Sequence, residues 1–85
     1  MKTYNLDFYY FGSCPFCQKV MRVIKDLDIK VTYKDIRKDQ ASLQKLMDDT
    51  GRRTVPCLYI DDKPMHESDD IISWLNDNKN DLAKN

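Results

Sequence analysis

The chain has 85 residues, and its 14 basic and 14 acidic side chains cancel to a formal net charge of zero. A chain of this length can form one small domain, which on folding buries only about 60% of the surface of the unfolded chain. The sequence has no basic stripe interleaved with aromatic residues, the pattern of a nucleic-acid surface. No stretch approaches the roughly 20 apolar residues that cross a membrane. We therefore expect the protein to bind neither nucleic acid nor a membrane.

The first two predicted elements are a strand and a helix. Apolar and polar residues alternate over Tyr4–Tyr10, which is the period of a strand, and Gly12-Ser13 interrupts the pattern. Pro15 then stands at the first position of a helix, where its missing N–H costs nothing. The apolar residues that follow at helical spacing are Phe16, Val20, Val23, Ile24 and Leu27.

The next elements are a strand, a helix and a hairpin. Residues 29–34 alternate again, and a strand reached through a crossover helix is predicted to be parallel to the first. Asp39 can cap a second helix, which Gly51 ends in a left-handed conformation. Residues 55–60 and 63–66 predict two strands joined by the turn-like pair Asp61-Asp62. The narrow apolar face of the second helix is Leu43, Leu46 and Met47.

The last predicted element is a helix for which Ser68 is a suitable N-cap. Asp69 and Asp70 place negative charge in its first turn, which the helix dipole favours. Residues 76–85 are expected to fray, although Leu82 can dock on the core. The predicted element order is therefore β-α-β-α-β-β-α. The buried face of the last helix is Ile71, Ile72, Trp74 and Leu75.

The sequence Cys14-Pro15-Phe16-Cys17 places two thiols at the first turn of a helix. Helix positions three apart are neighbours, so the two sulfur atoms can form a disulfide. The unpaired N–H groups and the dipole of a helix N-terminus stabilise a thiolate, and Cys14, at the N-cap, should feel them more than Cys17. Three cysteines are too few for a disulfide scaffold, which indicates a cycling thiol pair in the reducing cytoplasm.

Three motifs give the chain a resemblance to the glutaredoxins of the thioredoxin superfamily. Cys14-Pro15-Phe16-Cys17 matches the C-P-[YF]-C of that family, Thr54-Val55-Pro56 matches its T-V-P, and Asp69-Asp70-Ile71 is similar to its D-D-L. The resemblance implies one glutaredoxin domain over residues 1–85, with a thioredoxin-like α/β fold. It also implies a central four-stranded mixed sheet flanked by three helices, and a cis peptide bond before Pro56.

The predicted cis bond gives residues 54–56 a function. On spacing alone, Pro56 could equally begin an edge strand. In the cis form implied by the resemblance, the backbone of Val55 turns outwards and can pair with an extended thiol peptide. Thr54, Val55 and Pro56 are therefore expected to bind glutathione.

The chain departs from the glutaredoxin pattern at His66-Glu67, where that family has Gly-Gly. Glu67-Ser68 resembles the E-S motif of glutathione transferase N-terminal domains, which holds the γ-glutamyl end of glutathione. The Ser68 hydroxyl and N–H can bind its carboxylate, and Glu67 or Asp69 can pair with its ammonium group. Ser68 can also serve as a helix cap, and the two roles are compatible.

A second departure is Phe11, where glutaredoxins often carry a lysine that pairs with the glycyl carboxylate of glutathione. Phe11 cannot make that ion pair. The cations that could replace the lysine are Arg37 and Lys38, in the loop before the second helix.

The resulting hypothesis is a monomeric, glutathione-dependent thiol-disulfide oxidoreductase. The Cys14 thiolate attacks protein disulfides or mixed disulfides of glutathione, and free glutathione or Cys17 resolves the intermediate. Phe16 is expected to lie against the bound tripeptide, with packing in the core as the alternative. The expected partners are glutathione and disulfide-bearing proteins, and no metal is expected.

Other functions also fit the pattern. A structural zinc site needs four ligands, and the chain has no second C-x-x-C to complete one. An iron-sulfur cluster bound between two subunits, with glutathione as an additional ligand, is known among glutaredoxins. The remaining alternatives are an electron donor of the ribonucleotide-reductase type that depends on thioredoxin reductase, and a non-catalytic glutathione-binding adaptor. Cys57 is interpreted as a small core residue and His66 as an ordinary surface residue.

Overall fold

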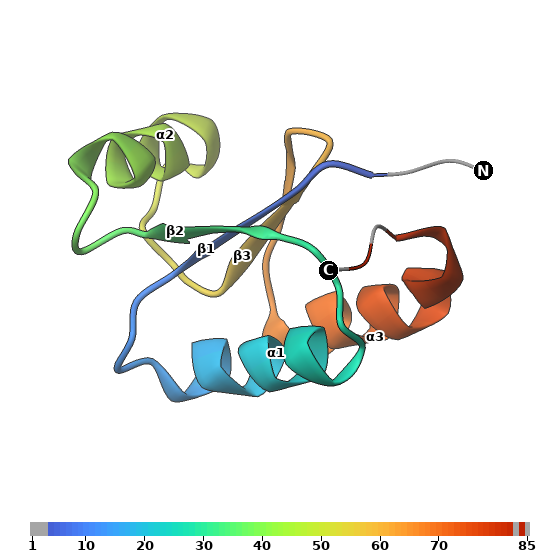
Figure 1. The fold of residues 1–85 in the computed structure, drawn as a ribbon. Coiled ribbons are helices and arrows are strands. Elements are labelled where there is room, and N and C mark those ends of the chain that lie inside the picture. The colour runs from blue at the N-terminus through green and yellow to red at the C-terminus, as the bar shows by residue number, and fades with distance from the viewer. Residues whose placement is uncertain (1–3, 83, 85) are drawn as a thin grey trace.

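The computed structural model describes residues 4–82 and 84. The strands form one sheet in the order β2-β1-β3-β4, in which β1 and β2 are parallel and the other pairs are antiparallel. The predicted order of elements and the four-stranded mixed sheet with three helices are confirmed (Figure 1). The elements are β1 (Leu6–Tyr10), α1 (Pro15–Asp26), β2 (Thr32–Asp35), α2 (Gln40–Thr50), β3 (Cys57–Ile60), β4 (Lys63–Met65), α3 (Ser68–Asn78) and the 3-10 helix η1 (Lys79–Asp81).

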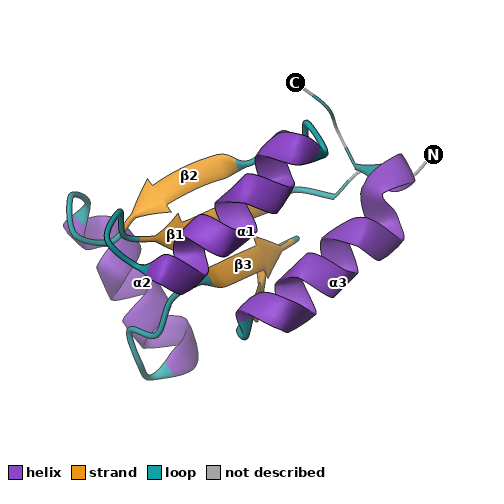
Figure 2. Cartoon of the chain, turned by 90° about the horizontal axis from the view of Figure 1, so that it is seen from below, coloured by secondary structure: helices purple, strands orange, loops and turns teal. Residues whose placement is uncertain are grey.

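Helices cover both faces of the sheet. Helices α1 and α3 lie side by side on one face and α2 lies on the other (Figures 1 and 2). Because successive side chains of a strand point to opposite faces, Phe8 belongs to the core under α1 and α3, while Tyr9 belongs to the core under α2. In β3, Leu58 likewise belongs to the core under α1 and α3, and Tyr59 belongs to the core under α2. The two central strands are therefore almost continuously apolar.

The predicted starts of two helices and the end of one are confirmed. Cys14 is the N-cap of α1. Asp39 caps α2, with Oδ1 accepting a hydrogen bond from the Ala41 N–H at 3.2 Å. Gly51 ends α2 with φ of 75°, in the left-handed region that glycine adopts without a steric penalty.

The predicted bounds of the strands were partly wrong. The second strand begins at Thr32, because the register pairs Thr32 with Asp7 and β1 itself begins only at Leu6. Ile29, which we expected in that strand, is buried and forms an isolated antiparallel bridge with Lys84. The third strand begins at Cys57, which pairs with Tyr9 near the end of β1, so residues 55 and 56 lie outside the sheet.

The prediction that Ser68 is an N-cap was wrong. Ser68 is the first residue of α3, and Glu67 occupies the N-cap position with φ of 70° and no capping hydrogen bond from its side chain. Glu67 has a positive φ, and the helix begins at Ser68, one residue earlier in the chain than a cap at Ser68 would give. Ser68 therefore presents a backbone N–H of the first turn, one of the groups that has no acceptor within a helix.

The prediction that the chain frays from residue 76 was also wrong for the described residues. Helix α3 continues to Asn78 and is followed by η1, since the side chains of Asn76 and Asn78 donate hydrogen bonds to backbone carbonyls one turn earlier, at 3.0 and 2.9 Å. Leu82 is buried in the core, as expected. Residues 83 and 85 of the predicted frayed segment lie outside the described residues. Within the described chain, no helix has the length and apolar character needed to cross a bilayer.

Candidate active site

The two thiols of the C-x-x-C sequence lie at the start of α1, in different environments. Cys14 Sγ accepts a hydrogen bond from the Cys17 N–H at 3.4 Å, so a backbone dipole of the first helical turn points at this sulfur. Cys14 is 6% exposed and Cys17 is fully buried. The cysteine that lies nearer the surface is therefore also the one whose sulfur receives an N–H group of the first helical turn.

Burial keeps the other two cysteines protonated. Loss of hydration, together with the hydrogen bond to Cys14, raises the pKa of Cys17 to about 12. Burial likewise raises the pKa of Cys57, in the core under α2, to about 12. Both side chains are thiols at neutral pH, and Cys57 packs as a small apolar residue, in agreement with its predicted role.

Seven of the residues predicted to bind glutathione line one pocket of about 370 Å³. The pocket is formed by the first turn of α1, the segment before β3 and the start of α3, three segments far apart in the sequence. The Val55–Pro56 peptide bond is cis, as expected. The lining residues are Phe16, Thr54, Val55, Pro56, Glu67, Ser68 and Asp69.

Phe16 is an exposed wall of this pocket. Its side chain is 61% exposed, the largest value among the exposed large apolar residues of the described chain, so the alternative that it packs in the core was wrong. Position 16 lies in the first turn of α1, two residues after the N-cap Cys14. An exposed aromatic ring near the Cys14 thiol offers an apolar surface on which the stem of a peptide can pack.

Of the two cations predicted for the glycyl carboxylate, Arg37 lines a pocket and contacts Phe11. Its guanidinium carbon lies 4.7 Å from the centre of the Phe11 ring, a cation-π contact. Arg37 and Phe11 line a second pocket of about 430 Å³ together with Ile36, Leu43 and Arg53. Lys38 is not among the residues that line either pocket. Arg53, a lining residue that the sequence analysis did not single out, stands directly before Thr54.

Asp69 has an ionic partner that the sequence pattern did not reveal. Lys19 Nζ of α1 lies 2.7 Å from Asp69 Oδ1 at the start of α3. Both side chains are mainly exposed, at 53% and 84%. This ion pair joins the N-terminal half of α1 to the first turn of α3, beside the pocket that Asp69 lines.

His66 is not the ordinary surface residue that we expected. It follows β4, is only half-buried as a whole, and its Nε2 is buried without a hydrogen-bond partner among the described residues. Burial first, and then the nearby charge of Arg52, lower the pKa of His66 from its usual value of 6.5, although the Thr54 backbone and Glu67 act in the opposite direction. The imidazole is therefore held in its neutral form.

We predict that folding stability decreases as the pH falls below the usual histidine pKa. The native state binds the His66 proton less readily than the unfolded chain, so the contribution of neutral His66 is complete above pH 6.5 and is lost as the pH falls through the lowered native value. Because His66 is the single histidine, a His66→Gln variant should show a flatter dependence of the urea midpoint between about pH 7 and about pH 5. An identical pH dependence in both proteins would contradict the prediction.

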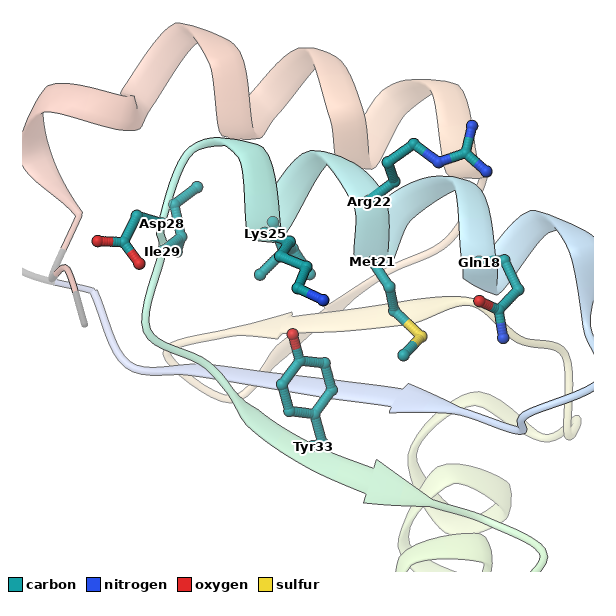
Figure 3. Close-up of a pocket in the computed structure, with 8 residues that line it drawn as sticks. Gln18, Met21, Arg22, Lys25, Asp28, Ile29 and Tyr33 are labelled. Carbon is teal, nitrogen blue, oxygen red and sulfur yellow. The ribbon is translucent and has the colours of Figure 1, made fainter.

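A pocket of about 500 Å³ lies between α1 and the edge strand β2 (Figure 3). The Tyr33 ring stands opposite Met21 and Lys25 of α1 there. None of the predicted site residues lines it. Among residues 4–82 and 84, no three His, Cys, Asp or Glu side chains gather in a way that could hold a metal ion.

Comparison with known proteins places this site in context. Residues 8–82 match the family described as the glutathione S-transferase N-terminal domain. Among curated proteins, glutaredoxin-C4 of Arabidopsis thaliana is 40% identical over 76 residues, which cover 85% of this chain and 56% of that protein. Glutaredoxin-C8 of Oryza sativa subsp. japonica is 32% identical over 89 residues, which cover 99% of this chain and 64% of that protein. The chain thus spans only about half to two thirds of the length of these relatives.

Solved structures share the fold. The crystal structure of a buckwheat glutaredoxin-glutathione complex superposes with a TM-score of 0.72 at 21% sequence identity, covering 94% of this chain and 83% of that chain. At this identity, the similarity shows a common fold. The fold comprises the sheet and helices that bring the C-x-x-C, the cis proline and the start of α3 together in the present structure.

Proposed function

The chain is a glutaredoxin of the thioredoxin superfamily and belongs to the glutathione S-transferase N-terminal domain family, and from that membership we propose that it is a glutathione-dependent thiol-disulfide oxidoreductase. Its substrates are protein disulfides and mixed disulfides of glutathione. The observation that carries the proposal is the pocket beside Cys14, which is lined by Phe16, the cis-proline segment and the Glu67-Ser68-Asp69 segment.

The proposed monothiol cycle has two exchange steps. The Cys14 thiolate attacks the glutathione sulfur of a mixed disulfide, the S–S bond breaks, and the substrate leaves as a thiolate that takes up a proton. A glutathione thiolate then attacks the glutathione sulfur bound to Cys14. Oxidised glutathione is released and the Cys14 thiolate returns, so the net reaction converts one mixed disulfide and one free glutathione into the substrate thiol and one oxidised glutathione.

Cys17 supports a second branch for protein disulfides. It attacks the mixed disulfide between Cys14 and the protein, which releases the reduced protein and leaves a Cys14–Cys17 bond that two glutathione molecules reduce. Because burial raises the pKa of Cys17 to about 12, its attack requires loss of a tightly held proton. We therefore propose that free glutathione, and not Cys17, resolves the glutathionylated enzyme in most turnovers.

The lining residues suggest how the tripeptide is held. The backbone of Thr54-Val55 pairs with the extended cysteinyl part, and the first-turn N–H groups of α3 at Ser68 bind the γ-glutamyl carboxylate. Arg37 and Arg53 face the glycyl carboxylate from the neighbouring pocket, with Phe11 supporting the guanidinium of Arg37. Cys57 has no role in the cycle. We propose a monomer working in a reducing compartment such as the cytoplasm.

The electron donor provides the test. With NADPH, glutathione and glutathione reductase, the protein should reduce the mixed disulfide of glutathione and 2-mercaptoethanol catalytically. With NADPH and thioredoxin reductase in place of the glutathione system, we expect turnover near the background. The reverse pattern would contradict the proposal and support the thioredoxin-reductase-dependent alternative.

A further inference from the structure

The Lys19–Asp69 ion pair lies beside the pocket of the candidate active site, because Asp69 lines that pocket. Asp69 lines the pocket with Phe16 and Ser68, and Lys19 Nζ is 2.7 Å from Asp69 Oδ1. The pair joins α1 to α3, which lie side by side on one face of the sheet (Figure 2). The same rim therefore presents a cation, an anion and the N–H groups that begin a helix.

A purely structural role for this pair has little support. The two side chains are 53% and 84% exposed, and exposed ion pairs contribute little to stability because water screens them. Helices α1 and α3 are already joined by a buried apolar core that includes Val20, Ile24, Ile71 and Leu75. The pair is therefore free to exchange partners when a charged ligand arrives.

The chemistry of the pair matches one end of glutathione. The γ-glutamyl end is an α-amino acid, with a carboxylate and an ammonium group on the same carbon atom. A lysine and an aspartate in contact can receive both groups at once, the carboxylate on Lys19 and the ammonium on Asp69, and each new ion pair replaces half of the existing one. A peptide that has no α-amino-acid group next to the Lys19–Asp69 pair would not form these two ion pairs.

We propose that Lys19, acting together with Asp69, is a specificity-determining residue that selects thiols and disulfides carrying a γ-glutamyl α-amino-acid group. This inference rests on the proposed function and deepens it. Lys19 completes the recognition of the γ-glutamyl carboxylate that Ser68 begins. The proposal assigns to α1 a part of the binding site that the Glu67-Ser68 motif alone would place entirely on α3.

The test measures the first exchange step with two disulfides. In a Cys17→Ser background, the reduced protein is mixed with the 2-mercaptoethanol disulfide of glutathione or of cysteinylglycine, and the Cys14 conjugate is followed by mass spectrometry. Lys19→Met should lower the second-order rate constant for the glutathione disulfide by about five- to tenfold, as expected for loss of an exposed charge-assisted hydrogen bond. The rate with the cysteinylglycine disulfide, which lacks the γ-glutamyl group, should not change.

Three further variants make the result specific. Lys19→Arg should keep the original rate, because it retains the charge. Asp69→Asn should slow the glutathione reaction, and its effect should not add fully to that of Lys19→Met, because both remove parts of one contact. Lys25→Met removes an exposed cation further along α1, which lines the pocket between α1 and β2. This variant should leave both rates unchanged.

The outcomes separate this inference from the proposed function. If Lys19→Met leaves both rates unchanged, or lowers them equally, Lys19 is not a specificity residue and the inference is overturned. An equal effect of Lys25→Met would show general electrostatic attraction and would overturn it as well. If the protein with Lys19 intact forms no Cys14 conjugate with either disulfide, the proposed function itself fails.

Discussion

Replacing Cys14 by serine should abolish glutathione-dependent turnover, with a loss of at least about a thousandfold, as expected when a covalent nucleophile is removed. Cys14 Sγ is the sulfur that receives the Cys17 N–H at the start of α1. A serine hydroxyl at this position would not ionise at neutral pH and would not exchange with a disulfide. The measurement is the glutathione-coupled reduction of the mixed disulfide of glutathione and 2-mercaptoethanol.

Two other cysteine variants serve as controls. Cys17→Ser should keep most of the activity with this substrate, because glutathione resolves the intermediate and Cys17 is a buried thiol with its pKa raised to about 12. It should lose activity with protein disulfides that require the second branch. Cys57→Ala should behave as the unsubstituted protein in both assays, since Cys57 lies in the core under α2.

Equal loss of activity in Cys14→Ser and Cys17→Ser would refute the monothiol cycle. Such a result has to be distinguished from misfolding, because each substitution replaces a buried sulfur. Far-ultraviolet circular dichroism and the urea midpoint of each variant provide this check. Retained activity in Cys14→Ser, in a protein with an unchanged midpoint, would remove Cys14 from the mechanism.

The secondary structure could be predicted where one local signal determines it. The period of β1, Pro15 at the first position of α1, the cap at Asp39 and the left-handed Gly51 each act within a few residues of the chain. The start of β2 could not be predicted in this way. Ile29 continues the alternation, but whether it joins the strand depends on the register with β1, which is a property of the pair of strands.

The candidate site was predicted by resemblance more than by pattern. No periodicity connects Phe16, Val55 and Ser68, which only the fold brings to one pocket, and the motifs of a known family supplied that connection. Where the chain departs from the family, prediction was weaker. Arg53 and the Lys19–Asp69 pair were missed, because a surface cation gives no sign in the sequence of the partner that it meets.

Replacing Phe8 by alanine should destabilise the protein by about 3–5 kcal/mol, the range found when a buried aromatic side chain is truncated. Phe8 lies at the centre of β1, is fully buried, and stacks with Tyr10 at 5.9 Å between ring centres. It also meets the Tyr33 ring edge-on at 6.2 Å. A domain of 85 residues has a free energy of unfolding of about 4–13 kcal/mol, so this one cavity would remove a large part of it.

Urea unfolding followed by tryptophan fluorescence measures the effect, since the single Trp74 lies in α3 against the same core. Phe8→Leu keeps most of the apolar volume and should be clearly less destabilising than Phe8→Ala. Tyr33→Ala, at a 45% exposed position on the rim of the same aromatic group, should cost less than Phe8→Ala because it opens no enclosed cavity. If Phe8→Ala and Tyr33→Ala shifted the midpoint equally, the core under α1 and α3 would not be the main source of stability, and the helix that carries Cys14 would be held by other contacts.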